Sequence, residues 1–152
     1  FSNYIFGDSP YDKIWVYRIP SLLGIVLSLL LIYKFLKSIY SREVALLSIL
    51  FILTSFLTIS EIHQAKTDGM LFLFITLCNL LVLKAIFDGH LSNHFKLLYW
   101  VSMAMGILVK GPIILIFTIL PLLALSIIQK RNFFNFIWTK YGFFIFFLIF
   151  YF

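Results

Sequence analysis

The chain has 152 residues, of which 62% are hydrophobic and 12% are charged, and its mean hydropathy is +1.06. One soluble core of this size could not bury so much apolar side chain, so the composition excludes a soluble protein and predicts an integral membrane protein. The net charge of +6 does not indicate a nucleic-acid partner, because the basic residues are scattered between apolar runs and form no single stripe. Cys78, the single cysteine, cannot form an internal disulfide or a cysteine metal site.

The first half of the chain predicts three membrane spans. Residues 2–17 mix turn residues with aromatic residues, a composition typical of a membrane interface. Arg18-Ile19-Pro20-Ser21 then opens a span over residues 19–36, and we expect Pro20 to lie in the first helical turn, where proline is tolerated. The second span is expected over residues 44–60 and the third over residues 69–87.

The second half predicts three more spans. Residues 97–128 as one helix would be about 48 Å long, well beyond a hydrocarbon core of about 30 Å. We therefore predict two spans, 97–109 and 113–128, with a tight turn at Lys110-Gly111-Pro112. Residues 141–152 are typical of a last span cut short. The expected fold is an all-α, polytopic transmembrane helical bundle with about six spans in what we take to be a fragment of a longer protein.

The basic residues predict the orientation of this bundle. Alternating the spans places eight of them on one side of the membrane: Lys34, Lys37, Arg42, Lys84, Lys96, Lys130, Arg131 and Lys140. The other side holds four: Lys13, Arg18, Lys66 and Lys110. The side richer in lysine and arginine should be cytoplasmic. Arg18, residues 61–68 and Lys110 are then expected together near the external face.

Residues 61–70 hold the densest polar cluster between two apolar runs. If the second span stays helical to its end, Glu61, Gln64 and Asp68 share one helix face. Ionisable groups at the edge of a membrane often serve a pathway or a site, but a solvated loop between spans explains these residues too. His63 beside Glu61 is too small a set to hold a divalent cation, so we predict no metal site.

Two basic residues are candidates for binding phosphate. A turn made by Gly111 and Pro112 does not require a lysine before it, and the Lys110 ammonium at the interface is suited to hold a phosphate group. The Arg18 guanidinium could bind two phosphate oxygens. The alternatives are a simple turn at Lys110 and an interfacial anchor at Arg18.

Three short motifs carry a resemblance to a known family. They are Arg18-Ile19-Pro20-Ser21, Ala65-Lys66-Thr67-Asp68 and the stretch from Gly106 to Pro112, which reads Gly-Ile-Leu-Val-Lys-Gly-Pro. In this order and spacing they resemble the amino-terminal membrane part of bacterial GT-C glycosyltransferases, the group related to protein O-mannosyltransferases and to the aminoarabinose transferase that modifies lipid A.

The resemblance implies an integral-membrane enzyme of the bacterial plasma (inner) membrane. Such an enzyme transfers a sugar from a polyprenyl-phosphate donor to a lipid or protein acceptor on the external, periplasmic face. The donor is a substrate, and no cofactor is firmly implied. The resemblance assigns a catalytic role to Asp68 and phosphate binding to Arg18, Lys66 and Lys110. Lys66 and Asp68 could equally form a structural ion pair.

The resemblance also bears on domain organisation. Residues 1–152 are expected to be part of one transmembrane glycosyltransferase domain. The first span and most of the first external loop, where the family is expected to carry a further acting carboxylate, would precede them, so we expect these residues alone to be inactive. The alternative function is a secondary transporter or a non-catalytic membrane subunit. A transporter should show related halves and polar groups near the bilayer midplane, whereas the polar groups here gather at one end of the predicted spans.

Overall fold

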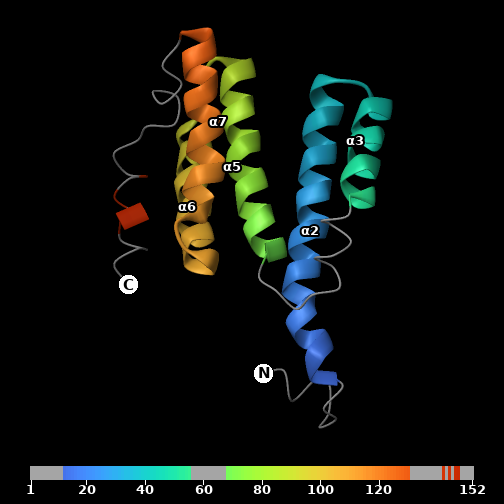
Figure 1. Ribbon diagram of the computed structural model, residues 1–152. Coiled ribbons are helices and arrows are strands. Elements are labelled where there is room, and N and C mark those ends of the chain that lie inside the picture. Colours follow the sequence, from blue (N-terminus) through green and yellow to red (C-terminus); the bar gives the residue numbers. More distant parts are fainter. Residues whose placement is uncertain (1–11, 56–67, 131–141, 143, 145, 148–152) are drawn as a thin grey trace. The chain divides into compact units, whose positions relative to one another are not determined.

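A computed structural model describes residues 12–55 and 68–130, together with residues 142, 144, 146 and 147. The described part consists of helices joined by short connections and contains no strand (Figure 1). Its five numbered helices are α2 (Asp12–Ile39), α3 (Arg42–Thr54), α5 (Asp68–Asp88), α6 (Asn93–Lys110) and α7 (Ile113–Gln129). The all-α class predicted from the sequence is confirmed for these residues.

Two of these helices are long and apolar enough to cross a membrane. They cover Arg18–Ile39, within α2, and Asp68–Asp88, and a shorter apolar helix covers Ile113–Ile128. The helix α3 has 13 residues, which at about 1.5 Å per residue gives roughly 20 Å, less than the hydrocarbon thickness. The predicted second span continues through residues 56–60 and the predicted last span begins at residue 141, and both segments lie largely outside the described residues. The number of six spans therefore stays a prediction.

The start of the first long helix differs from its prediction. We expected Pro20 in the first helical turn, but α2 begins at Asp12 and Pro20 lies inside it. The helix extends back through the residues before Arg18. It therefore lacks one backbone hydrogen bond, because Pro20 has no N–H to donate. Membrane helices tolerate such a proline because neighbouring groups satisfy the freed carbonyl.

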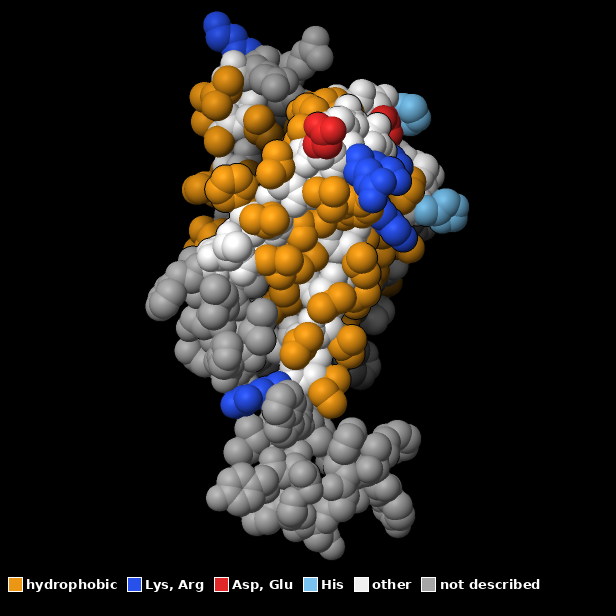
Figure 2. Space-filling view, turned by 90° about the vertical axis from the view of Figure 1, so that its right-hand side faces the viewer, with side chains coloured by type: hydrophobic (Ala, Val, Ile, Leu, Met, Phe, Trp, Pro, Cys, Tyr) orange, Lys and Arg blue, Asp and Glu red, His pale blue; other side chains and the backbone are white. Residues whose placement is uncertain are grey.

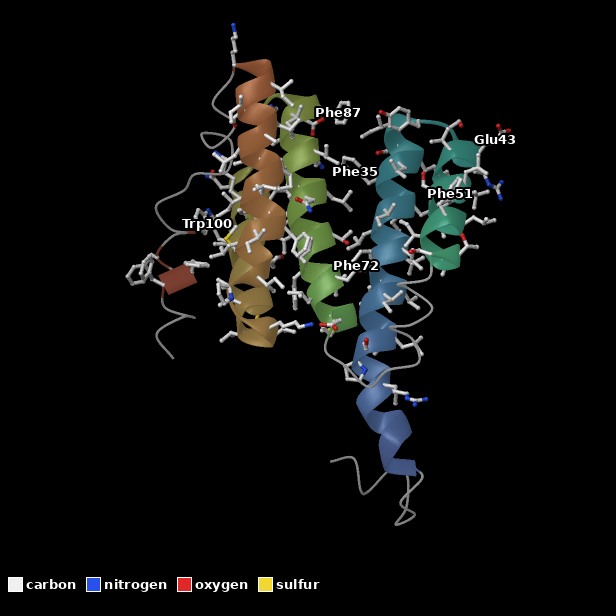
Figure 3. The ribbon with its side chains drawn as sticks, viewed as in Figure 1. Phe35, Glu43, Phe51, Phe72, Phe87 and Trp100 are labelled. Carbon is white, nitrogen blue, oxygen red and sulfur yellow. The ribbon has the colours of Figure 1, made fainter. Side chains whose placement is uncertain are left out.

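The chain divides into two compact units, Phe1–Leu73 and Phe74–Phe152, with α5 passing from the first into the second. In the first unit α2 and α3 form an antiparallel pair (Figure 1). Ser41 caps α3, since its side chain accepts a hydrogen bond from the Val44 N–H. Glu43 in the first turn of α3 is exposed (Figure 3) and complements the helix dipole.

In the second unit the remainder of α5 packs with α6 and α7. Its core contains six buried residues: Cys78, Leu81, Val82, Tyr99, Met103 and Leu122. Asn79 of α5 donates a hydrogen bond from Nδ2 to the Phe117 carbonyl of α7, at 3.4 Å. Trp100 of α6 meets the Phe146 ring edge-on, with 5.7 Å between the ring centroids. Chain segments far apart in sequence therefore share one core.

The turn between α6 and α7 lies where the sequence predicted it. The helix α6 ends at Lys110 and α7 begins at Ile113. Gly111 has φ of 76°, a backbone conformation that favours glycine, and its N–H donates to the Ile107 carbonyl at 2.7 Å. The predicted break of residues 97–128 into two helices is confirmed.

The described surface is rich in large apolar side chains. Phe51 is 75% exposed, Ile127 is 75% exposed and Leu120 is 64% exposed. Hydrophobic side chains cover much of the face seen in Figure 2. A water-soluble monomer rarely exposes contiguous apolar surface of this extent, whereas lipid-facing helices do. The exposure agrees with the membrane location that the composition predicts.

Candidate functional site

The first turn of α5 is anchored to α2 by a hydrogen bond. The Gly69 N–H donates to the Ser21 hydroxyl oxygen at 3.2 Å, and both residues are buried. Gly69 follows the first residue of α5, so its N–H is one of the donors that an α-helix leaves without a partner in the same helix. This contact fixes the start of α5 against the amino-terminal half of α2.

Two glycines let the two backbones touch at the same place. A Cβ atom on Gly24 would lie 2.6 Å from the Gly69 carbonyl carbon and 2.8 Å from the Met70 nitrogen. A Cβ atom on Gly69 would lie 2.5 Å from the Ser21 hydroxyl oxygen. Close crossings through small residues are typical of helix packing in membranes, where dispersion contacts hold helices together. We call Ser21, Gly24 and Gly69 the α2–α5 crossing.

The α2–α5 crossing brings together two of the predicted site residues. Arg18 lies three residues before Ser21 on α2, a spacing that places both on one helix face. Asp68 is the first residue of α5 and directly precedes Gly69. Both side chains are half-buried, the Arg18 Nε atom is buried, and both have interaction partners. A carboxylate and a guanidinium that are 50 positions apart in the sequence thus flank one helix contact.

Asp68 lies in the first turn of α5. The amino-terminal end of a helix carries a partial positive charge from aligned peptide dipoles, which stabilises a carboxylate in the first turn. The Gly69 N–H that Ser21 binds belongs to the same turn. The carboxylate is therefore held at the helix end without full exposure to solvent.

Lys110 is the last residue of α6 and belongs to the second unit. Its side chain is exposed and has interaction partners. The carboxyl-terminal end of a helix favours a cation, so the local structure supports an ammonium group there. The Gly111 conformation and the turn that follows place Lys110 at the boundary between two apolar helices.

Within each unit, the basic residues lie at the helix ends to which the predicted membrane orientation assigns them. In the first unit Lys34, Lys37 and Arg42 lie at the α2–α3 turn, whereas Arg18 lies on the other half of α2. In the second unit Lys84 and Lys96 flank the α5–α6 connection and Lys130 ends α7. Lys110 lies at the opposite end of that unit, at the α6–α7 turn.

Residues 1–152 match the protein family described as "Dolichyl-phosphate-mannose-protein mannosyltransferase". The chain belongs to this family. The resemblance found in the three sequence motifs is confirmed, and membership places the chain among membrane glycosyltransferases of the GT-C type. No curated protein and no solved structure matches the chain.

Lys66 is the remaining predicted site residue of this family member, and it lies outside the described residues. Glu61, His63 and Gln64 of the same polar cluster also lie outside them. The expected helix face shared by Glu61, Gln64 and Asp68 therefore stays a prediction. Within the described ranges 12–55 and 68–130, no group of three or more His, Cys, Asp or Glu side chains is placed to hold a metal ion.

The α2–α5 crossing was not predicted from the sequence. Ser21 was noted only as the last residue of a motif, and Gly24 and Gly69 were not singled out. The available signal was the spacing of Ser21, Gly24 and Ser28 at i, i+3 and i+7, a face of small residues on an otherwise bulky apolar helix. That signal predicts a close helix contact but does not say which helix makes it.

Proposed function

We propose that this family member transfers a sugar from a polyprenyl-phosphate donor to a lipid or protein acceptor at the external face of a bacterial plasma membrane. The observation that carries the proposal is the joint position of Arg18 and Asp68 at the α2–α5 crossing in a chain that belongs to a mannosyltransferase family. An acid and a base at one end of apolar helices suit chemistry on a substrate whose lipid lies in the bilayer.

The reaction needs one bond to form and one to break. The acceptor oxygen bonds to the anomeric carbon of the sugar, the bond from that carbon to the phosphate oxygen breaks, and its electron pair leaves with the polyprenyl phosphate. The acceptor proton passes to a carboxylate. A positioned carboxylate contributes about 100-fold to 10,000-fold to such a proton transfer.

Each residue has a role in this proposal. Asp68 orients the acceptor or assists removal of its proton, together with the further carboxylate that the resemblance leads us to expect. Arg18, Lys66 and Lys110 hold the phosphate and offset the negative charge that grows on it as the bond breaks. The Arg18 guanidinium suits two phosphate oxygens, and a lysine ammonium acts as a point charge.

The external location rests on the separation of basic residues within each unit. The ends that carry Lys34, Lys37 and Arg42, and Lys84, Lys96 and Lys130, are assigned to the cytoplasm by the positive-inside rule. Arg18 and Lys110 lie at the opposite ends of their units, so both are assigned to the external side. Addition of a membrane-impermeant thiol reagent to intact cells tests this assignment, with Ser92→Cys and Pro112→Cys as probes at exposed positions. Only the thiol at position 112 should be labelled.

The activity itself is tested by transfer of labelled sugar from a polyprenyl-phosphate donor by the full-length protein in membrane vesicles. Asp68→Asn should lower the transfer rate by at least about 100-fold if the carboxylate acts at the reacting centre. Asp88→Asn is the matched control, since Asp88 is an exposed aspartate at the other end of the same helix. Equal rates for Asp68→Asn and Asp88→Asn would remove Asp68 from the site.

A further inference from the structure

Hydroxyl groups in the described helices commonly donate to their own helix. Ser28 donates to the Gly24 carbonyl at 2.7 Å, Ser102 to the Leu98 carbonyl at 2.7 Å and Thr118 to the Ile114 carbonyl at 2.8 Å. Such bonds satisfy a hydroxyl locally and place no constraint on another helix. Ser21 differs, because its oxygen accepts a hydrogen bond from a residue 48 positions away.

The acceptor role of Ser21 is that of a helix cap. In an ordinary N-cap, a serine oxygen just before the helix accepts from the N–H of the second or third helical residue. Gly69 is the second residue of α5. The oxygen that accepts from its N–H belongs to the amino-terminal half of α2, so Ser21 caps α5 from another helix.

We infer that Ser21 is a positioning residue for sugar transfer, which acts by capping α5 and thereby holding Asp68 beside Arg18. The inference rests on the proposed role of Asp68 in transfer. Ser21 is 4% exposed and sits at a contact where the two backbones leave no room for a side chain on Gly24 or Gly69. It is therefore positioned to set the place of α5's first turn without touching substrate.

Asp68 and Arg18 both lie close in sequence to the two residues of the Ser21–Gly69 hydrogen bond. The Asp68 Cα is one residue from the capped N–H, and Arg18 is one helical turn from the capping hydroxyl. A movement of the first turn of α5 shifts the carboxylate by a similar distance. A misplacement of about 1 Å at a reacting centre can lower a rate by roughly 100-fold, so even a partial loss of this anchor should be measurable.

The experiment uses the full-length protein in membrane vesicles and compares Ser21→Ala with Ser28→Ala. Both substitutions remove a buried hydroxyl from α2, but only the Ser21 hydroxyl binds α5. Ser21→Ala should lower kcat by about 10-fold or more while the KM for the lipid-linked donor changes little. Ser28→Ala should retain the wild-type kcat. Equal kcat values for the two variants would overturn the inference.

A double mutant separates positioning from general destabilisation. If Ser21 acts through Asp68, then Ser21→Ala added to Asp68→Asn should lower kcat by no more than about twofold, because the residue being positioned has already lost its function. A full 10-fold further loss in the double mutant would show that Ser21 acts elsewhere, and would overturn the inference.

Amide hydrogen exchange distinguishes failure of this inference from failure of the proposed function. The peptide covering residues 68–73 should exchange roughly fivefold faster in Ser21→Ala than in Ser28→Ala, because the Gly69 N–H loses its partner. If the wild type transfers no sugar, the proposed function and the positioning role both fail, whatever the exchange rates show. If the wild type transfers sugar but exchange is the same in both variants, only the capping role fails.

A second variant keeps the test decisive if Ser21→Ala does not accumulate in the membrane. Ser21→Cys retains a side chain of similar size with a weaker acceptor. Its kcat should fall between that of the wild type and that of Asp68→Asn. A Ser21→Cys kcat equal to that of Ser28→Ala would overturn the inference.

Discussion

Replacement of Gly24 by alanine is predicted to disturb both the stability of the protein and the position of Asp68. The new Cβ would lie 2.6 Å from the Gly69 carbonyl carbon, whereas ordinary contacts begin at 3.4 Å. The two helices must therefore separate by at least about 0.8 Å, because the Gly69 carbonyl oxygen lies nearer still and backbone atoms cannot turn away. A shift of that size along the same direction lengthens the Ser21–Gly69 hydrogen bond from 3.2 Å to about 4 Å, beyond bonding distance.

The energetic effects of Gly24→Ala oppose one another. Overpacking costs about 1–3 kcal/mol, and loss of the hydrogen bond costs about 1 kcal/mol. The higher helix propensity of alanine stabilises the folded protein by about 1 kcal/mol and offsets part of this loss. We expect a net loss of about 1–3 kcal/mol in the free energy of unfolding, and a fall in transfer rate because the first turn of α5 has moved.

Gly106→Ala provides the matched control for this prediction. Gly106 is also a buried glycine inside a helix, but its added Cβ would meet side-chain atoms of Ile114, with no backbone of another helix among its nearest contacts. The two quantities to compare are the apparent melting temperature of purified full-length protein in detergent and the rate of sugar transfer in vesicles. Gly24→Ala should lower both values more than Gly106→Ala does. A Gly24→Ala protein as stable and as active as the wild type would refute the close backbone contact.

Three further predictions follow from other contacts. Lys110→Ala should lower kcat/KM for the donor by about 10-fold, since an ammonium that binds phosphate contributes roughly 1–2 kcal/mol. Lys34→Ala, which removes a lysine near the α2–α3 turn of the first unit, should leave kcat/KM unchanged, and equal values for the two variants would argue against phosphate binding by Lys110. Asn79→Ala should lower the free energy of unfolding by about 0.6 kcal/mol by removing the hydrogen bond to Phe117, measured by melting temperature, without changing the transfer rate. Gly111→Val should destabilise the α6–α7 turn by about 1–3 kcal/mol because a β-branched residue does not tolerate the φ of 76°; an unchanged melting temperature would contradict the turn geometry.

Local chemistry explains which parts of the fold could be predicted. Hydropathy identified the apolar runs, and Gly111 with Pro112 predicted the break between α6 and α7, because turn conformation depends on the residues at the turn itself. The predicted start of the first helix, with Pro20 in its first turn, was wrong. Proline is common in the first helical turn, but a preceding aromatic-rich segment can continue the helix, and the sequence alone does not decide between the two.

The pairing of helices could not be predicted in the same way. Arg18 and Asp68 were proposed separately, from their charges and from a family resemblance, and hydropathy contains no information that α5 begins against Ser21. Contact between Gly24 and Gly69 depends on three-dimensional packing of two helices that α3 separates in the sequence. The face of small residues on α2 was visible, but its partner became known only from the structure.

Asp68 is the residue on which the proposed transfer reaction depends most directly. The first measurement is therefore the transfer of labelled sugar from a polyprenyl-phosphate donor by full-length wild type, Asp68→Asn and Asp88→Asn at matched protein levels in membrane vesicles. We predict transfer by the wild type and by Asp88→Asn, and a loss of at least about 100-fold in Asp68→Asn. Transfer by Asp68→Asn at the wild-type rate would contradict the proposed site.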